Sequence, residues 1–199
     1  MTKKIAEVVS LLFNPLFLIV VLLILGILES NLSQTKTLVL LLLILFFNGF
    51  APSVFLLYYS RRGIVIDDIV YNKSVIKNRA FLLGWGTIVL FLELIALFVL
   101  RKPEPLFALV VALFLLVLAL FSINIYRKIS LHAAGITFFC FSVLALFGLS
   151  FWPILLMIPL ICWSRLYLVR HTIKQLGAGF SISLLILAAT LYFLHIPIS

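Results

Sequence analysis

Charged side chains are scarce in this chain of 199 residues. Only 11% of its residues are Asp, Glu, Lys or Arg and 65% are apolar, whereas a soluble domain has about 25% charged residues. So few polar residues cannot cover a water-soluble globule, and the mean hydropathy is +1.35. The composition excludes soluble enzymes, coiled coils, nucleic-acid binders and disordered tails, and it indicates an integral membrane protein.

Cysteines and acidic residues are also few. The two cysteines, Cys140 and Cys162, lie inside apolar runs, which excludes a disulfide framework or a cysteine metal centre. Six acidic residues stand against 15 Lys and Arg, a net charge of +9. In a membrane protein the excess of Lys and Arg orients the helices and binds the phosphates of lipid head groups. We therefore expect a lipid bilayer and no nucleic acid as partner.

Long polar stretches are nearly absent, and the chain divides at its charges and turn formers. Because a spanning helix needs about 20 apolar residues, we expect seven spans, close to residues 8–29, 36–59, 80–100, 106–126, 133–150, 152–169 and 174–195. The fifth and sixth form a helical hairpin if residues 148–153 make a tight turn, and without that turn six spans result. The predicted fold is an all-α polytopic transmembrane bundle with one membrane domain over residues 1–199.

The one long polar segment covers residues 60–79, between the second and third spans. Ile64, Ile66 and Val70 interrupt its charges, a pattern typical of a segment that rests in the membrane interface. We expect this loop to lie against the membrane, to close a site, and to place Arg79 at the start of the third span.

If the chain crosses the membrane seven times, its basic residues are distributed very unevenly between the two sides. One side, which we call side A, carries Lys3, Lys4, Arg61, Arg62, Lys73, Lys77, Arg79, Arg127, Lys128, Arg165, Arg170 and Lys174. The other carries Lys36, Arg101 and Lys102. The positive-inside rule therefore predicts that side A faces the cytoplasm of a cell-membrane protein.

Two histidines, His132 and His171, also belong to side A, each at the start of a span and a few residues after a cation. A helix N-terminus with free amide groups, together with Arg, Lys and Ser donors, binds phosphate oxygens. Imidazoles beside such a site can supply a nucleophile and a proton donor.

The order and spacing of these residues resemble the type 2 phosphatidic acid phosphatase superfamily. Its third motif, Ser-Arg-x5-His-x3-Asp, matches Ser164-Arg165 and His171, with Gln175 in place of Asp. Its second, Pro-Ser-Gly-His, matches 129–132 but keeps only Ser130 and His132. Its first, Lys-x6-Arg-Pro, matches loosely: five residues separate Lys73 from Arg79, and Ala80 replaces Pro. The resemblance covers residues 60–199.

The resemblance implies an all-helical, metal-independent lipid phosphatase without a cofactor. His171 would be the nucleophile that forms a phosphohistidine, and His132 the general acid. The phosphoryl oxygens would be bound by Lys73, Arg79, Ser130 and Arg165, to which we add Lys128 because of its position. The fixed cations would stabilise the charge that grows on the phosphoryl oxygens in the transition state.

Gln175 is the main departure from the family pattern. It lies four residues after His171, so the two stack on one helix face, and its oxygen can accept a hydrogen bond from the ring without adding charge. A noncatalytic lipid-binding protein is therefore an alternative. A small transporter is another, which Glu93 within the third span favours and the absence of an inverted repeat opposes. Phosphatidate, phosphatidylglycerol phosphate, isoprenyl diphosphates and lipid-linked sugar phosphates all fit as substrates, and the oligomeric state stays open.

Overall fold

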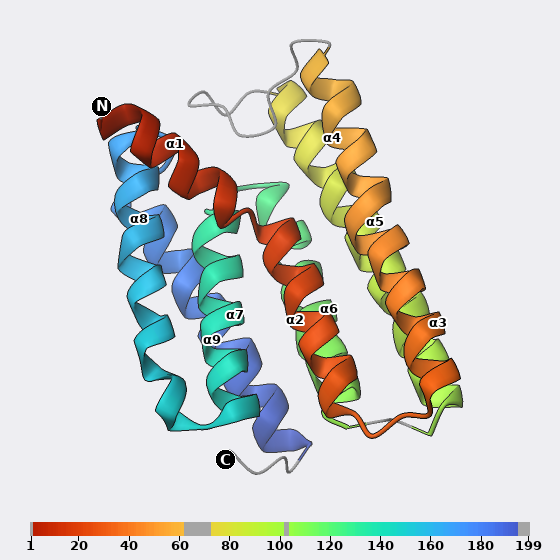
Figure 1. The fold of residues 1–199 in the computed structure, drawn as a ribbon. Coiled ribbons are helices and arrows are strands. Elements are labelled where there is room, and N and C mark those ends of the chain that lie inside the picture. The colour runs from red at the N-terminus through yellow and green to blue at the C-terminus, as the bar shows by residue number, and fades with distance from the viewer. Residues whose placement is uncertain (1, 62–72, 102–103, 195–199) are drawn as a thin grey trace.

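The structure, a computed structural model, describes residues 2–61, 73–101 and 104–194, and these residues form helices and no strand. Figure 1 shows the helical bundle. Its elements are α1 (Thr2–Leu12), α2 (Pro15–Glu29), α3 (Gln34–Ile44), the π-helix η1 (Leu45–Phe50), α4 (Ala51–Arg61), α5 (Lys73–Val99), α6 (Leu106–Asn124), α7 (Leu131–Phe147), the 3-10 helix η2 (Leu149–Leu156), α8 (Met157–Tyr167) and α9 (Ile173–Phe193).

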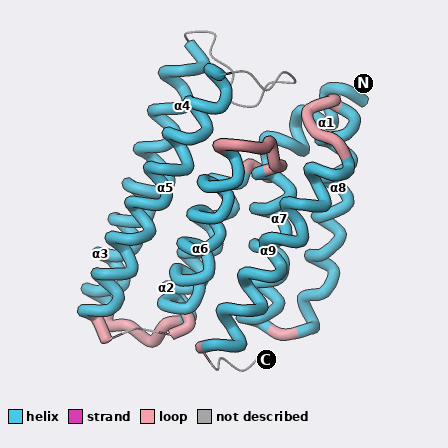
Figure 2. The backbone as a smooth tube through the Cα atoms, turned by 180° about the vertical axis from the view of Figure 1, so that it is seen from behind, coloured by secondary structure: helices cyan, strands magenta, loops and turns pink. Residues whose placement is uncertain are grey.

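Six helical segments in the described part of the chain are long and apolar enough to cross a membrane, which confirms the predicted transmembrane bundle. They are Thr2–Glu29, Gln34–Tyr58, Lys77–Val99, Leu106–Asn124, Leu149–Tyr167 and Ile173–Phe193. The remaining apolar helix, α7, has 17 residues, the lower end of the spanning range. The two ends of the described chain lie at opposite ends of the bundle (Figures 1 and 2), as an odd number of crossings requires.

Helix α7 lies at the centre of the packing. It contacts α2, α8, α9 and η2, while α6 packs against α2, α5 and α9. Its buried residues include Ile136, Phe138 and Cys140, which join the main apolar core. Helix α7 is therefore surrounded by other helices on several sides.

The first expected span is broken near its start. Residues 8–29 were predicted as one helix, but α1 ends at Leu12 and α2 begins at Pro15. The Asn14 side chain accepts a hydrogen bond from the Leu16 amide at 3.0 Å and so caps α2, while Pro15 occupies the first helical turn, where its missing N–H is not needed. Helix α1 thus leaves the line of α2 and packs against α8 (Figure 1).

The expected hairpin between the fifth and sixth spans is present, but its turn is shorter than predicted. Gly148 ends α7 with φ 86°, a left-handed conformation that glycine adopts without strain. Residues 149–156 then form η2 directly, so Ser150–Pro153 are part of the returning helix. Pro153 lies inside η2, and α8 continues directly from it at Met157.

The polar segment 60–79 is helical at both of its ends. Helix α4 ends at Arg61 and α5 begins at Lys73, about two turns earlier than the expected start at residue 80. No Pro or Gly occurs between residues 73 and 79 to stop the helix. Arg79 therefore lies in the second turn of α5, and the predicted closure by residues 62–72 lies outside the described residues.

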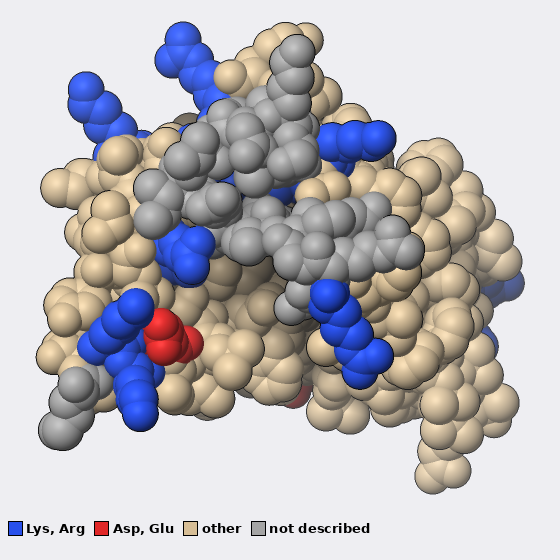
Figure 3. All heavy atoms as spheres, turned by 90° about the horizontal axis from the view of Figure 1, so that it is seen from above, with Lys and Arg blue, Asp and Glu red and all other residues tan. Residues whose placement is uncertain are grey.

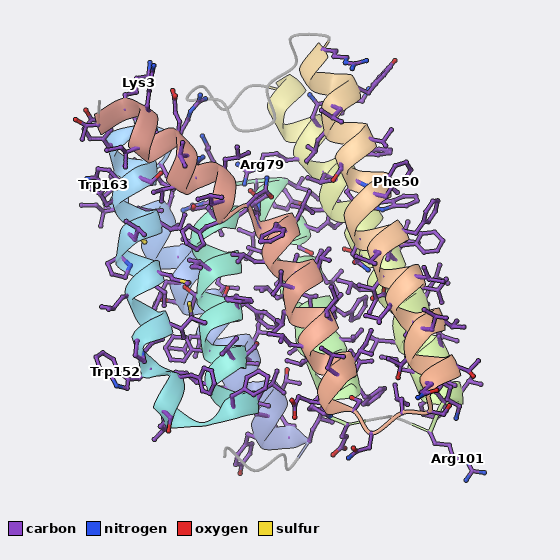
Figure 4. The ribbon with its side chains drawn as sticks, in the orientation of Figure 1. Lys3, Phe50, Arg79, Arg101, Trp152 and Trp163 are labelled. Atoms are coloured by element: carbon purple, nitrogen blue, oxygen red, sulfur yellow. The ribbon has the colours of Figure 1, made fainter. Side chains whose placement is uncertain are left out.

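The ends of the helices fall into two groups. The start of α1, the ends of α4, α6 and α8 and the starts of α5, α7 and α9 share one end of the bundle, which we call the polar end (top of Figure 1). Lys3 and Arg79 lie at this end and Arg101 at the other (Figure 4). Seen from above, Lys and Arg side chains gather around the polar end, and acidic side chains are few (Figure 3).

Candidate functional site

The predicted site residues come from six separate parts of the fold at the polar end. Arg79 belongs to α5, and Lys128 and Ser130 to the link between α6 and α7. His132 is in the first turn of α7, and Arg165 in the last turn of α8. His171 lies in the link before α9, and Gln175 is in the first turn of α9. Lys73 begins α5, but its side chain lies outside the described part.

His171 is the point where these parts meet. Its side chain is buried, and three cations act on it electrostatically: Arg165, Lys128 and Arg79. Burial first, and then these positive charges, lower the pKa of His171 from 6.5 to about 3. The imidazole is therefore neutral at physiological pH, the state in which a ring nitrogen can act as a nucleophile.

Gln175 orients the His171 ring. Its Oε1 lies 3.2 Å from His171 Nδ1, which is the contact expected from their four-residue spacing. The same oxygen accepts the backbone N–H of Thr172 at 3.2 Å, so it faces His171 as an acceptor. The hydrogen of the neutral ring is then on Nδ1, and Nε2 carries the available lone pair.

Thr172 and Gln175 together form a capping box at the start of α9. The Thr172 hydroxyl accepts the Gln175 amide at 3.4 Å, while the Gln175 side chain reaches back to Thr172. The sequence Thr172-x-x-Gln175 carries this signature, and our sequence analysis missed it. Gln175 thus has a structural role as well as its contact with His171.

The turn after α8 brings His171 back toward Arg165. The Arg170 amide donates to the Arg165 carbonyl at 3.0 Å and the Val169 amide to the Leu166 carbonyl at 2.9 Å. This pattern is a Schellman motif, in which the residue after the helix cap is left-handed and is usually glycine. Here Val169 takes that position with φ 55°, so a β-branched residue is strained beside the site.

Two buried cations tie the site together by bonds to backbone carbonyls. Arg79 is 1% exposed, and its Nη2 donates to the Ile129 carbonyl at 2.7 Å. Lys128 Nζ donates to the Arg170 carbonyl at 3.0 Å. The first bond joins α5 to the link before α7, and the second joins that link to the one before α9.

Ser130 caps α7 and lies against α9. Its hydroxyl oxygen accepts the Ala133 amide at 3.2 Å, and its backbone N–H donates to the Gln175 carbonyl at 3.3 Å. The approach depends on Gly179, because a Cβ there would lie 2.7 Å from the Ser130 carbonyl oxygen. The Ser130 hydroxyl hydrogen can still donate to a phosphate oxygen, since only the oxygen serves the cap.

His132 interacts with His171 and also lines a cavity. Its ring interacts electrostatically with His171 and Arg79, and it hydrogen-bonds to the backbone of Ser10. Together with Arg79 it lines a cavity of about 150 Å³, whose other walls are largely apolar. Those walls are formed by Asn14, Pro15, Leu16, Leu56, Leu82 and Leu131.

Helix α1 adds residues that the sequence analysis did not identify. Arg165 Nη1 donates to the Ser10 hydroxyl at 2.7 Å, and the Ser164 hydroxyl donates to the Ala6 carbonyl at 2.7 Å. The four-residue spacing of Ala6 and Ser10 places two small residues on one face of a helix whose other positions include Ile5 and Val8. This pattern indicates a packed face but not its partner.

Glu93 is not part of the site. Asn48 Nδ2 donates a hydrogen bond to Glu93 Oε1, which joins η1 to α5. Glu93 is 14 residues after Arg79 on the same helix, or roughly 21 Å along its axis. In the described structure Glu93 therefore bonds to a neighbouring helical segment and has no contact with either histidine.

Within the described residues, no three His, Cys, Asp or Glu side chains gather closely enough to hold a metal ion. Comparisons of the chain with protein-family models, with curated proteins and with solved structures gave no match.

Proposed function

We propose that this protein is a membrane-embedded, metal-independent phosphatase that removes phosphate from a lipid phosphate or diphosphate, similar to the type 2 phosphatidic acid phosphatases. The observation that carries the proposal is the environment of His171. A buried, neutral imidazole interacts electrostatically with Arg165, Lys128 and Arg79 and with His132. Three cations around a neutral nucleophile suit a phosphoryl group, whose oxygens carry negative charge.

In the first step, His171 Nε2 attacks phosphorus and the bond from phosphorus to the leaving oxygen breaks. The Gln175 side-chain oxygen accepts a hydrogen bond from His171 Nδ1–H and so keeps the ring in place. Arg79, Lys128 and Arg165 stabilise the charge on the equatorial oxygens. His132 gives its proton to the leaving oxygen, which departs as an alcohol or as a phosphate monoester.

In the second step, His132 accepts a proton from a water molecule as the water oxygen attacks the phosphohistidine. The bond between phosphorus and His171 Nε2 breaks, inorganic phosphate leaves, and both histidines return to their starting state. When substrate is bound, the negative charge of the phosphoryl group offsets the positive charge of Arg79 and so favours protonation of His132. One difficult hydrolysis is thereby divided into two easier steps.

The apolar walls beside His132 support a lipid as substrate. Leu16, Leu82 and Leu131 line the same cavity as Arg79 and His132. A phosphate group can therefore contact the Arg79 guanidinium while a hydrocarbon group contacts the leucines. A site at the end of a transmembrane bundle lies at the depth of lipid head groups. We place the polar end on the cytoplasmic face of the cell membrane, because it carries most Lys and Arg residues.

A noncatalytic lipid-phosphate binder is the second candidate, and Gln175 is the observation that favours it. Its side chain completes the capping box of α9 and brings no charge to His171. A protein of this kind would bind lipid phosphates at the same cations without forming a covalent intermediate.

The test is phosphate release by the purified protein from a panel of the four lipid classes, with a chelator present. We expect turnover of at least one lipid, inhibition by vanadate and a bell-shaped pH dependence. Ser122→Ala is the matched control, because the Ser122 hydroxyl donates within α6 to the Leu118 carbonyl on an exposed face. Binding of lipid phosphates without any release would favour the noncatalytic candidate.

A further inference from the structure

Ser10 of α1 contacts two residues of the site, although α1 lies outside the three motifs. Arg165 Nη1 donates to the Ser10 hydroxyl, and the His132 ring bonds to the Ser10 backbone. We propose that Ser10 is a positioning residue that orients Arg165 toward the phosphoryl group and His132 toward the leaving oxygen. This inference rests on the proposed phosphatase function.

The bond to the Ser10 hydroxyl holds one end of the Arg165 guanidinium group in place. Arg165 is 4% exposed, and its charge acts directly on His171. A guanidinium group is a planar fork of five N–H donors, so fixing Nη1 fixes the direction of the others. Ser10 therefore reduces the conformational entropy that Arg165 loses when a phosphate binds.

The backbone of Ser10 fixes the orientation of the His132 ring. A ring nitrogen that bonds to a backbone group sets the orientation of the imidazole and leaves the other nitrogen for the reaction. His132 belongs to α7 and Arg165 to α8, so one residue of α1 sets the relation between two helices that carry the reacting groups.

Helix α1 is itself anchored beside this contact. The Ala6 carbonyl accepts the Ser164 hydroxyl, and Ser164 directly precedes Arg165. Ala6 and Ser10 are four residues apart and face α8 together, while Ile5 and Val8 are exposed on another face. Two bonds to successive residues of α8 hold α1 in register with the site.

The first experiment compares Ser10→Ala with Ser10→Thr and with the Ser122→Ala control in steady-state kinetics. Ser10→Ala removes the hydroxyl but keeps the backbone contact to His132. We expect kcat/KM to fall about 10- to 100-fold, mainly through KM, with an unchanged pH profile. Ser10→Thr, which keeps a hydroxyl, should restore most of the loss. Wild-type kinetics in Ser10→Ala would overturn the inference.

A second measurement does not depend on activity. In protein labelled with 15N-arginine, a fixed guanidinium gives separate Nη signals because rotation of the group is slow. We expect separate Nη signals for Arg165 in the wild type and in Ser10→Thr, and faster exchange between these signals in Ser10→Ala. Averaged signals in the wild type would overturn the positioning role. Separate signals in a protein that releases no phosphate would instead reject the proposed function and retain the role of Ser10 in orienting Arg165.

Discussion

The polar end of the bundle and the segment formed by α3, η1 and α4 are stabilised in different ways. At the polar end, buried cations reach backbone carbonyls of other elements, as Arg79 does to Ile129 and Lys128 to Arg170. The other segment meets α5 through stacked rings of Phe55 and Phe81, 4.6 Å apart, and through the bond of Asn48 to Glu93.

The difference indicates what each region is built for. Aromatic and apolar packing stabilises a bundle without directing any charged group. The polar end gathers cations around His171, and their mutual repulsion opposes folding until an anion offsets it. Such an arrangement is expected of a preorganised anion site.

Among the residues around the nucleophile, the largest effect is expected from Arg79→Ala. Arg79 acts on both histidines and bonds to Ile129, so its loss removes charge stabilisation and a link between elements. We expect kcat/KM to fall about 100- to 1,000-fold. Lys77→Ala is the control, since Lys77 is an exposed cation on the same helix. Equal activities of the two variants would show that Arg79 is one surface cation among many.

Gly179→Ala should disrupt the polar end by packing alone. Its new Cβ would lie 2.7 Å from the Ser130 carbonyl and 3.1 Å from the Ala134 amide, so α7 and α9 must separate. We expect a loss of about 1–3 kcal/mol in the free energy of unfolding, together with lower activity. Gly177→Ala is the matched control, because no atom lies within 4 Å of its Cβ position. Equal free energies of unfolding for the two variants would show that the close approach of Gly179 to Ser130 does not stabilise the fold.

Acid should destabilise the phosphate-free protein through His171. The folded pKa of about 3 lies below the value of 6.5 for an unperturbed histidine, so between these pH values the unfolded state binds more protons. Stability therefore falls as pH decreases from 6.5, by about 2 kcal/mol at pH 5. Thermal melts of the wild type and His171→Gln should diverge in this window, and parallel curves would contradict the buried neutral ring.

The smallest effect is expected from restoring a charge at Gln175. Gln175→Asp reproduces the family residue, and Gln175→Glu adds the same charge while keeping the length that the capping box uses. Both should raise the pKa of His171, and turnover should rise several-fold, by about 1 kcal/mol of transition-state stabilisation. A fall in turnover with Gln175→Glu, whose cap is retained, would show that added charge does not help the nucleophile.

Much of the fold follows from local sequence features, whereas the site depends on contacts between distant residues. Apolar run lengths predicted the spanning helices, and the four-residue spacing predicted the contact of His171 with Gln175. Asn14-Pro15 carried a signal for the break in the first helix that we did not use. The role of Ser10 had no local signal, because its partners Arg165 and His132 are more than 100 residues away.

The most direct test is to trap the phosphoenzyme. The purified wild type, incubated with a radiolabelled lipid phosphate and quenched in alkali, should carry an acid-labile, alkali-stable phosphate on the peptide that contains His171. His171→Ala should carry none, whereas His132→Ala should still be labelled by a substrate whose leaving group needs no proton. Phosphate release by the wild type with label on no histidine, or equal labelling of His171→Ala, would contradict the account.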